Sequence, residues 1–295
     1  MHYSAADLTG VLAGAILTAG LYAVMSYGLA LIYGVMRLIN LSHAGTMMFG
    51  AFITLTLNRA FHLDPVLGSL VVLPLFFGFG VILYSLVVRR VARSAPIVSL
   101  LLLFGLWLVM QNVAYIIWGN DDESIITSYT YLTVKLGFLS LAVTRIIVFA
   151  AGLAALGVLA WFMSHTFTGR AIRAISLNHE ASRLAGINVD RISALAFGLG
   201  TGLAAFAGSL LTLLFSFTPD FGGVFQTKAF AVIVLGGLTS FVGVAIGSLL
   251  LALVESFGVL FMRASLQNLI AFGLLFLALV FMPGGIMSLR QSRRT

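Results

Sequence analysis

The sequence predicts an all-α, polytopic integral membrane protein, a helical bundle of about 8–10 spans with two short broken or re-entrant segments. Three observations predict this class. The 295 residues include only 16 Lys and Arg and 9 Asp and Glu, whereas roughly a quarter of the residues of soluble domains are charged. The mean hydropathy is +1.12. Apolar runs near the length of a membrane-spanning helix, about 20 residues, recur along the chain. We therefore expect residues 1–295 to form one transmembrane domain.

The apolar runs lie, in chain order, at 8–33, 45–57, 66–88, 96–118, 143–165, 192–215, 229–240, 241–258 and 265–283. Two of them, 45–57 and 229–240, are too short to span as ordinary helices. Each adjoins a polar or Gly-rich break, NLSHAG at 40–45 and GGLTS at 236–240. Irregular backbone at membrane depth is tolerated where protein or a water-filled cavity satisfies it. Paired short segments in the two halves of a chain are typical of a transport pathway.

The candidate pathway residues at these two breaks are Asn40, Ser42, His43, Gly236, Gly237, Thr239 and Ser240. We expect the three residues of the first break to satisfy backbone groups that the helix break frees. A broken helix at Gly236 and Gly237 would present helix ends to a zwitterionic solute. An adjacent Ser–His pair also invites a hydrolase reading, but neighbouring residues on a helix point about 100° apart, and no Gly-x-Ser-x-Gly turn accompanies the pair. No second His or Cys lies at ligand spacing for a metal.

Clusters of arginine predict the orientation of the chain. They are Arg89, Arg90 and Arg93, then Arg170, Arg173, Arg183 and Arg191, and finally Arg290, Arg293 and Arg294. The positive-inside rule places all three clusters in the cytoplasm, and it explains the basic balance better than nucleic-acid binding does. The 119–142 loop, with three acids and one Lys, is then outside. If each run crosses once, the N-terminus is outside and the C-terminus is cytoplasmic. We expect the first helix to be retained, since no clear cleavage site is present.

The segment 169–191 holds six charged residues between two long apolar runs. As one helix it would place Arg173, Glu180 and Arg183 on one face and a leucine-rich stripe beside them. Gly186 would end that helix. A solvated connector is one interpretation of this segment. Its length exceeds the roughly 2–8 residues of ordinary helix connections, which favours a docking surface.

Three stretches of the chain resemble branched-chain amino acid ABC importer permeases of the LivH/LivM family. They are GLALIYGVMRLINLSHAGTMMFGAF (28–52), GRAIRAISLNHEASRLAGINVDRI (169–192) and KAFAVIVLGGLTSFVGVAIGSLLLALVESFG (228–258). Within the second stretch, Glu180-Ala181-Ser182 followed by Gly186 is similar to the EAA loop of ABC importer permeases, with Ser182 in place of the second Ala. The resemblance is of the LivH type and covers residues 8–285.

This resemblance implies a non-enzymatic permease subunit of the bacterial inner membrane for branched-chain or related hydrophobic amino acids. It implies a second, LivM-like permease, two cytoplasmic ATPase subunits and a periplasmic solute-binding protein as partners, and no nucleic acid. The loop 166–191 would couple to the ATPases through Arg173, Glu180, Ala181, Ser182, Arg183 and Gly186. No P-loop Gly-x4-Gly-Lys-[Ser/Thr] occurs in the sequence. We therefore expect no cofactor on this chain and ATP use by its partners.

Two alternatives remain open at this point. Similar permeases carry urea, amides or aromatic acids, so the solute is not fixed. A proton-coupled secondary transporter is a different mechanistic class, and it would gain support if Glu255 faced the bundle interior. We expect instead that Glu255 and Arg263 reach the outer interface by snorkelling.

Overall fold

The computed structural model describes residues 5–92, 94–137, 139–238, 240–261, 267–281 and 285. Its elements are α1 (Ala5–Met36), α2 (His43–Phe61), α3 (Pro65–Leu83), the π-helical turn η1 (Tyr84–Val88), α4 (Arg89–Val91), α5 (Pro96–Trp118), β1 (Thr133–Leu136), β2 (Leu139–Ala142), α6 (Val143–His165), α7 (Phe167–Leu177), α8 (His179–Leu184), α9 (Val189–Leu211), α10 (Phe221–Gly236), α11 (Phe241–Phe261) and α12 (Gln267–Phe281). Among the described residues, six helices are long and apolar enough to cross a membrane. The predicted class, a polytopic membrane helical bundle, is confirmed.

The two apolar runs that were too short to span a membrane, 45–57 and 229–240, belong to longer helices in the structure. The first is α2, whose 19 residues start at His43, directly after the break. The second is α10, which has 16 residues but begins at Phe221, eight residues before the predicted run. Gln226 and Lys228 interrupt the apolar pattern in the sequence, yet both are buried inside the bundle. The predicted bounds of 229–240 were wrong because these two polar residues are paired within the protein rather than exposed.

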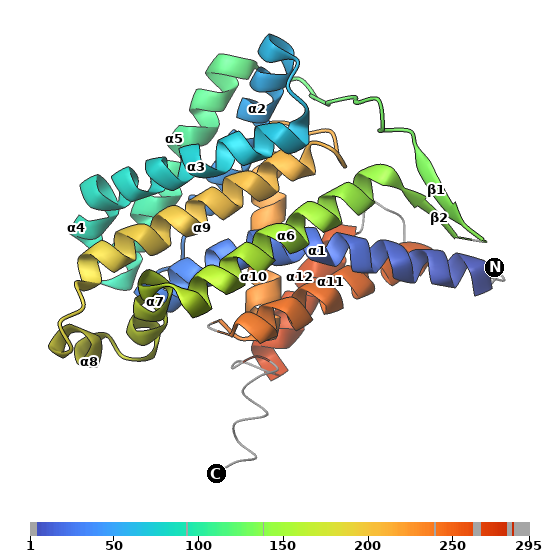
Figure 1. Ribbon diagram of the computed structural model, residues 1–295. Helices are drawn as coiled ribbons and strands as arrows, with labels where there is room; N and C mark the ends of the chain where they lie inside the picture. Colours follow the sequence, from blue (N-terminus) through green and yellow to red (C-terminus); the bar gives the residue numbers. More distant parts are fainter. Residues whose placement is uncertain are drawn as a thin grey trace.

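Helix α9 is the most deeply buried long helix and packs against α1, α2 and α3. In Figure 1 it runs between α3 and α6. At two glycines its contact with α2 leaves no room for a side chain. A Cβ at Gly208 would lie 1.9 Å from the carbonyl oxygen of Met47, and one at Gly50 would lie 2.1 Å from that of Ala205. Small residues of this kind let helices in lipid approach closely and gain dispersion contacts.

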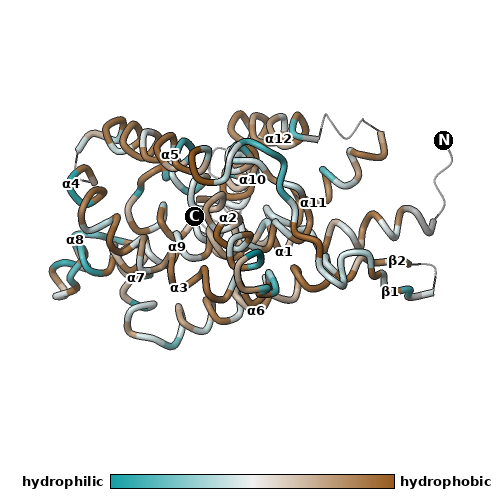
Figure 2. Tube along the Cα trace, turned by 90° about the horizontal axis from the view of Figure 1, so that it is seen from above, coloured by the Kyte–Doolittle hydropathy of each residue, from teal (hydrophilic) through white to brown (hydrophobic). Residues whose placement is uncertain are grey.

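The two ends of the bundle differ in what they carry. The β1–β2 hairpin and the start of α1 lie at one end, and α4, α7 and α8 lie at the opposite end (Figures 1 and 2). Figure 2 shows hydrophilic residues gathered around α8, whereas the long helices are mainly hydrophobic. Arg89 forms an ion pair of 2.9 Å with Asp190, so the first two arginine clusters meet at the α8 end. That relative placement agrees with the sequence. The third cluster lies outside the described residues.

Candidate functional site

The amphipathic helix α7 leads into the α8 end of the bundle. Ala171, Ile172 and Ile175 face the core, and Arg170 and Arg173 are exposed. The helix starts after Thr166, whose Oγ1 accepts a hydrogen bond of 3.0 Å from the amide of Gly169. The alternation of buried aliphatic and exposed basic residues fixes the helix against the bundle and directs its arginines outward.

A break at Asn178 separates α7 from α8. Its backbone is extended, with φ −154° and ψ 111°, and its Oδ1 accepts hydrogen bonds of 3.0 Å from the amides of Glu180 and Ala181. Asparagine is favoured at this helix-capping position because its side chain satisfies amides that lack a helical partner. The sequence-based expectation of a single helix through this segment was therefore wrong. Arg173 lies on α7, whereas Glu180 and Arg183 lie on α8.

Gly186 ends α8, as predicted. It has φ +82°, its amide donates to the oxygen of Arg183 at 3.0 Å, and the amide of Ile187 donates to the oxygen of Ser182 at 3.1 Å. These two bonds form a Schellman motif, which requires a left-handed residue at this point. The short helix is thus closed at both ends by defined hydrogen bonds, which holds its outward face in one position.

The last residue of α7 and the outward face of α8 together form what we call the coupling surface. It consists of Leu177, Glu180, Ala181, Arg183 and Leu184, all of them exposed. The two leucines are 81% and 91% exposed. Ser182 instead is buried, and its hydroxyl donates to the oxygen of Asn178 at 2.7 Å. The serine that departs from the EAA pattern therefore faces the bundle and leaves this surface unchanged.

The break between α1 and α2 gathers the first set of candidate pathway residues. Asn40, Ser42 and His43 are all buried. The hydroxyl of Ser42 donates to Asn40 Oδ1 at 2.6 Å, and His43 Nε2 lies 2.9 Å from the oxygen of Met25 in α1. The amide of Gln226 in α10 donates to the oxygen of Asn40 at 3.0 Å. Sequence reasoning missed Gln226, because a single Gln near an apolar run carries no pattern.

The second break, after α10, is organised by close packing. A Cβ at Gly236 would lie 2.2 Å from the oxygen of Gly243, so this glycine allows α10 and α11 to touch. Gly236 is therefore both the last residue of α10, at the break expected from the sequence, and packed against α11. Gly237 has φ +100° and ends α10, and Ser240 Oγ accepts from the amide of Gly243 at 3.0 Å. Thr239 lies outside the described residues.

The two breaks do not meet in one place. The first lies beside Gln226, and Gly236 lies ten positions further along α10, which is about 15 Å along a helix. The candidate residues therefore form two groups at different depths. Whether either group contacts a solute stays a prediction. In the part of the chain that the structure describes, no three His, Cys, Asp or Glu are grouped so that they could hold a metal ion.

An ion pair lies inside the bundle, and one of its members is Glu255, which we expected at the outer interface. Glu255 on α11 is 1% exposed and does not reach the interface. Lys228 Nζ on α10 lies 3.0 Å from its Oε1 and 3.1 Å from its Oε2. The Tyr22 hydroxyl on α1 donates to Glu255 Oε2 and accepts from Lys228 Nζ at 3.0 Å. The expected snorkelling of Glu255 was wrong because a lysine from another helix neutralises it. Arg263 lies outside the described residues.

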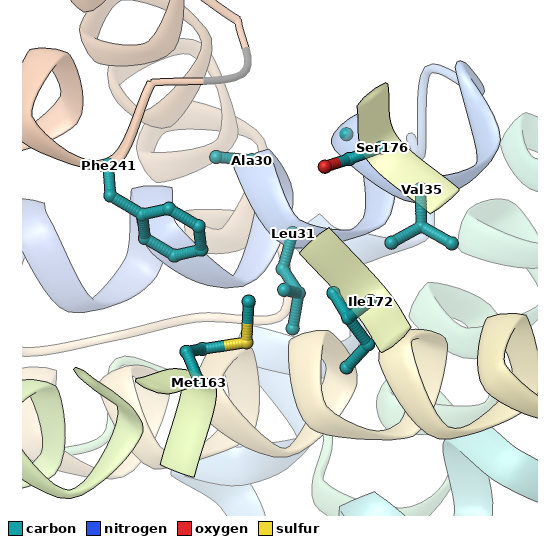
Figure 3. A pocket seen from close by; sticks show the side chains of 8 residues that line it. Ala30, Leu31, Val35, Met163, Ile172, Ser176 and Phe241 are labelled. Atoms are coloured by element: carbon teal, nitrogen blue, oxygen red, sulfur yellow. The ribbon is translucent and has the colours of Figure 1, made fainter. Parts of the chain in front are cut away.

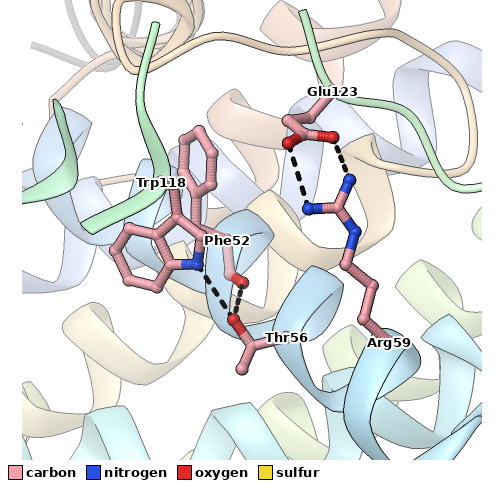
Figure 4. A network of polar contacts seen from close by, with 5 residues as sticks. All are labelled: Phe52, Thr56, Arg59, Trp118 and Glu123. Carbon is pink, nitrogen blue, oxygen red and sulfur yellow. Dashed lines mark hydrogen bonds and ion pairs between the residues drawn. The ribbon is translucent and has the colours of Figure 1, made fainter. Parts of the chain in front are cut away.

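The loop at the hairpin end is fastened to the end of α2 (Figure 4). Arg59 forms a two-bond ion pair with Glu123, and Trp118 Nε1 donates to Thr56 Oγ1 at 3.0 Å. Glu123 also exchanges backbone hydrogen bonds of 3.0 and 2.9 Å with Phe217. These contacts hold the chain between α5 and β1 across the end of the bundle.

A small cavity lies under α7, between α1, α6 and Phe241 (Figure 3). Its volume is about 20 Å³, and Ser176 is the only hydroxyl-bearing residue in its lining. A space of that size admits little more than one water. It is therefore not a site for an amino acid.

Comparison with known proteins decides the class of protein to which this bundle belongs. Residues 11–279 match the family described as branched-chain amino acid transport system / permease component. The chain belongs to this family. It is 30% identical over 281 residues to the high-affinity branched-chain amino acid transport system permease protein BraD of Pseudomonas aeruginosa, covering 90% of this chain and 91% of the relative. To the LivH permease protein of Escherichia coli it is 29% identical over 279 residues, with the same coverage.

Another relative of this permease family member is named for a different solute. The ribose import permease protein RbsC of Escherichia coli is 32% identical over 176 residues, which cover 57% of this chain and 52% of the relative. No solved structure matches the chain. The resemblance stated from the sequence is confirmed, and the chain is a multi-pass membrane permease whose relatives are transport proteins.

Proposed function

We propose that this chain is a permease subunit of an ATP-binding-cassette importer for branched-chain or related hydrophobic amino acids. It forms the translocation pathway with a second, LivM-like permease in the bacterial inner membrane. Two cytoplasmic ATPase subunits supply the energy, and a periplasmic binding protein delivers the solute. By the positive-inside rule the α8 end, where Arg89 pairs with Asp190, would face the cytoplasm, and we propose a cytoplasmic C-terminus.

The coupling surface is the observation that carries this proposal. A merely solvated connector has no need for a capped helix with an exposed leucine at its end and another just before it. An isolated exposed leucine is ordinary in proteins. Here Leu177 at the end of α7 and Leu184 at the end of α8 flank Glu180 and Arg183, beside the basic cluster. This pattern fits an apolar contact ringed by charges, as protein interfaces have.

The contacts of α8 indicate how a force on this surface reaches the bundle. The imidazole of His179 contacts the oxygen of Val35, in the last turn of α1. Asn188, just after α8, caps α9 by accepting from the amide of Arg191 at 3.0 Å. A displacement of α8 by an ATPase would thus act on the end of α1, next to the break at residues 37–42, and on the start of the central helix.

The test is ATP-driven uptake of L-leucine by the complete importer in proteoliposomes. We expect uptake that requires the ATPase subunits and the binding protein. The alternative of a proton-coupled transporter would gain support from a Glu255 that faces the bundle interior. Glu255 does lie there, but its carboxylate is paired with Lys228. Uptake by this chain alone, driven by a pH gradient without ATPase subunits, would contradict the importer and support the alternative.

A further inference from the structure

Lys228 lines a cleft between α10 and α12, and its partner Glu255 is buried next to it but is not part of the cleft lining. The cleft has a volume of about 140 Å³ and is lined by Val224, Thr227, Lys228, Asn268, Ala271 and Phe272 among others. One water needs about 10–15 Å³ of such space, so the cleft has room for a small organic group. In Figure 2, α10 lies between α5 and α12.

Holding a bundle together does not require such an ion pair. Removing two charges from water is costly, and well-packed apolar residues in their place are often neutral or stabilising. The sequence contains two lysines, and one of them occupies this buried position on a membrane helix. Ionisable residues inside spans face the bundle interior or a cavity and mark pathways for solutes or ions.

The pair also has hydrogen-bonding capacity left over. Glu255 Oε1 lies 3.0 Å from Lys228 Nζ, which makes an ion pair by distance. Yet within the described residues no donor is aligned for a hydrogen bond to that oxygen, although it is fully buried. The ammonium of Lys228 also lies 5.4 Å from the ring centre of Tyr22 and 5.5 Å from that of Phe225. A carboxylate oxygen can accept more than one hydrogen bond, so Oε1 can take a further donor beside Lys228.

We propose that this pair receives the two charged ends of a zwitterionic amino acid. The solute's carboxylate takes Lys228 Nζ, and its ammonium donates to Glu255. Its side chain enters the cleft against Val224, Ala271 and Phe272. In the empty permease, Glu255 occupies the place of the solute carboxylate. The exchange adds no net charge to the bundle, because each ionised group keeps an opposite partner.

The proposal rests on the proposed function. It indicates which class of solute the permease carries. A zwitterion with a small branched side chain matches both charges and the apolar cleft wall. Urea and amides carry no carboxylate, and aromatic acids carry no ammonium. Each would leave one member of the separated pair without a partner at membrane depth, which is a strong penalty.

The test compares variants within the complete reconstituted importer, measuring L-leucine uptake and ATP hydrolysis together. Lys228→Met combined with Glu255→Leu removes both charges and keeps apolar volume. We expect normal assembly and basal ATP hydrolysis, and uptake reduced at least about tenfold, since paired charges that contact a ligand dominate its binding. Lys135→Met removes the other lysine, which is exposed on β1, and should leave uptake unchanged.

A charge-exchanged variant, Lys228→Glu with Glu255→Lys, separates the two roles of the pair. It keeps an ion pair between α10 and α11, so it assembles even if the apolar variant does not. It places the positive charge away from the cleft, so uptake should stay low. Normal uptake by either double variant would overturn the site and leave the pair as a tie between helices. A wild-type complex that imports no leucine would contradict the proposed function itself.

Discussion

The Nε2 atom of His179, the first residue of α8, contacts the carbonyl oxygen of Val35. Val35 lies 144 positions earlier, in the last turn of α1. This bond joins the coupling surface to the helix that precedes the first break. We predict that His179→Ala keeps the ATPase subunits bound but lowers the number of leucine molecules imported per ATP hydrolysed. His179→Gln, which retains a polar group at that position, should recover part of the loss. Unchanged stoichiometry in His179→Ala would show that force passes elsewhere.

Gly186→Val should damage the coupling surface through the backbone. A branched residue at φ +82° is strained by about 1–2 kcal/mol, so the Schellman motif opens and α8 loses its fixed position. We expect intact membrane insertion and pairing with the second permease, with reduced co-purification of the ATPases. Gly157→Val is the matched control, because Gly157 lies in α6 with nothing within 4 Å of its added Cβ. Equal ATPase recovery in both variants would contradict the docking role.

Glu180→Ala tests whether the charge on the coupling surface meets a partner. An exposed pair within the loop is worth at most about 1 kcal/mol, so its loss alone would not abolish transport. A charge desolvated against an ATPase could cost about 2–5 kcal/mol. We therefore expect Glu180→Ala to weaken ATPase binding at least tenfold, about 1.4 kcal/mol, in a pull-down titration. Asp122→Ala, at the hairpin end of the bundle, should have no effect on that binding.

Single cysteines test the orientation, since the sequence has none of its own. Ser124 is exposed at the hairpin end and Ala181 is exposed on α8. In cells with a permeable outer membrane, an impermeant thiol reagent should label Ser124→Cys and spare Ala181→Cys. Lysed cells should show labelling at both positions. The reverse pattern in intact cells would place α8 outside and remove the basis for an ATPase contact there.

Much of the fold could be predicted from the sequence, because lipid imposes a strict demand on composition. A spanning helix must be apolar over its whole length, so the long runs matched α1, α3, α5, α6, α9 and α11 closely. For the same reason the start of α10 could not be predicted from the sequence. Gln226 and Lys228 look like the end of an apolar run, and only the folded bundle shows that they have buried partners.

The candidate site was harder to predict, because its contacts are distant in the sequence. Lys228 lies 27 positions from Glu255 and 206 from Tyr22, and no helical period joins residues at such separations. The break at Asn178 did leave a local signal, an asparagine followed by an acid in the next turn. The regular spacing of residues on either side of it favoured one continuous helix instead. The Gly186 turn was predicted because left-handed backbone has a strong residue preference.

The direct backbone contact between α10 and α11 limits how these helices can move. Gly236, Gly243 and Gly247 bring main chain against main chain, and added Cβ atoms there would lie 1.9–2.5 Å from carbonyl oxygens. Helices that slide past each other normally absorb small shifts by adjusting the side chains between them. At these three glycines the contact contains no side chain to adjust. The two helices should therefore tilt together as a single lever, and Lys228 and Glu255 would travel with it as a fixed unit through the transport cycle.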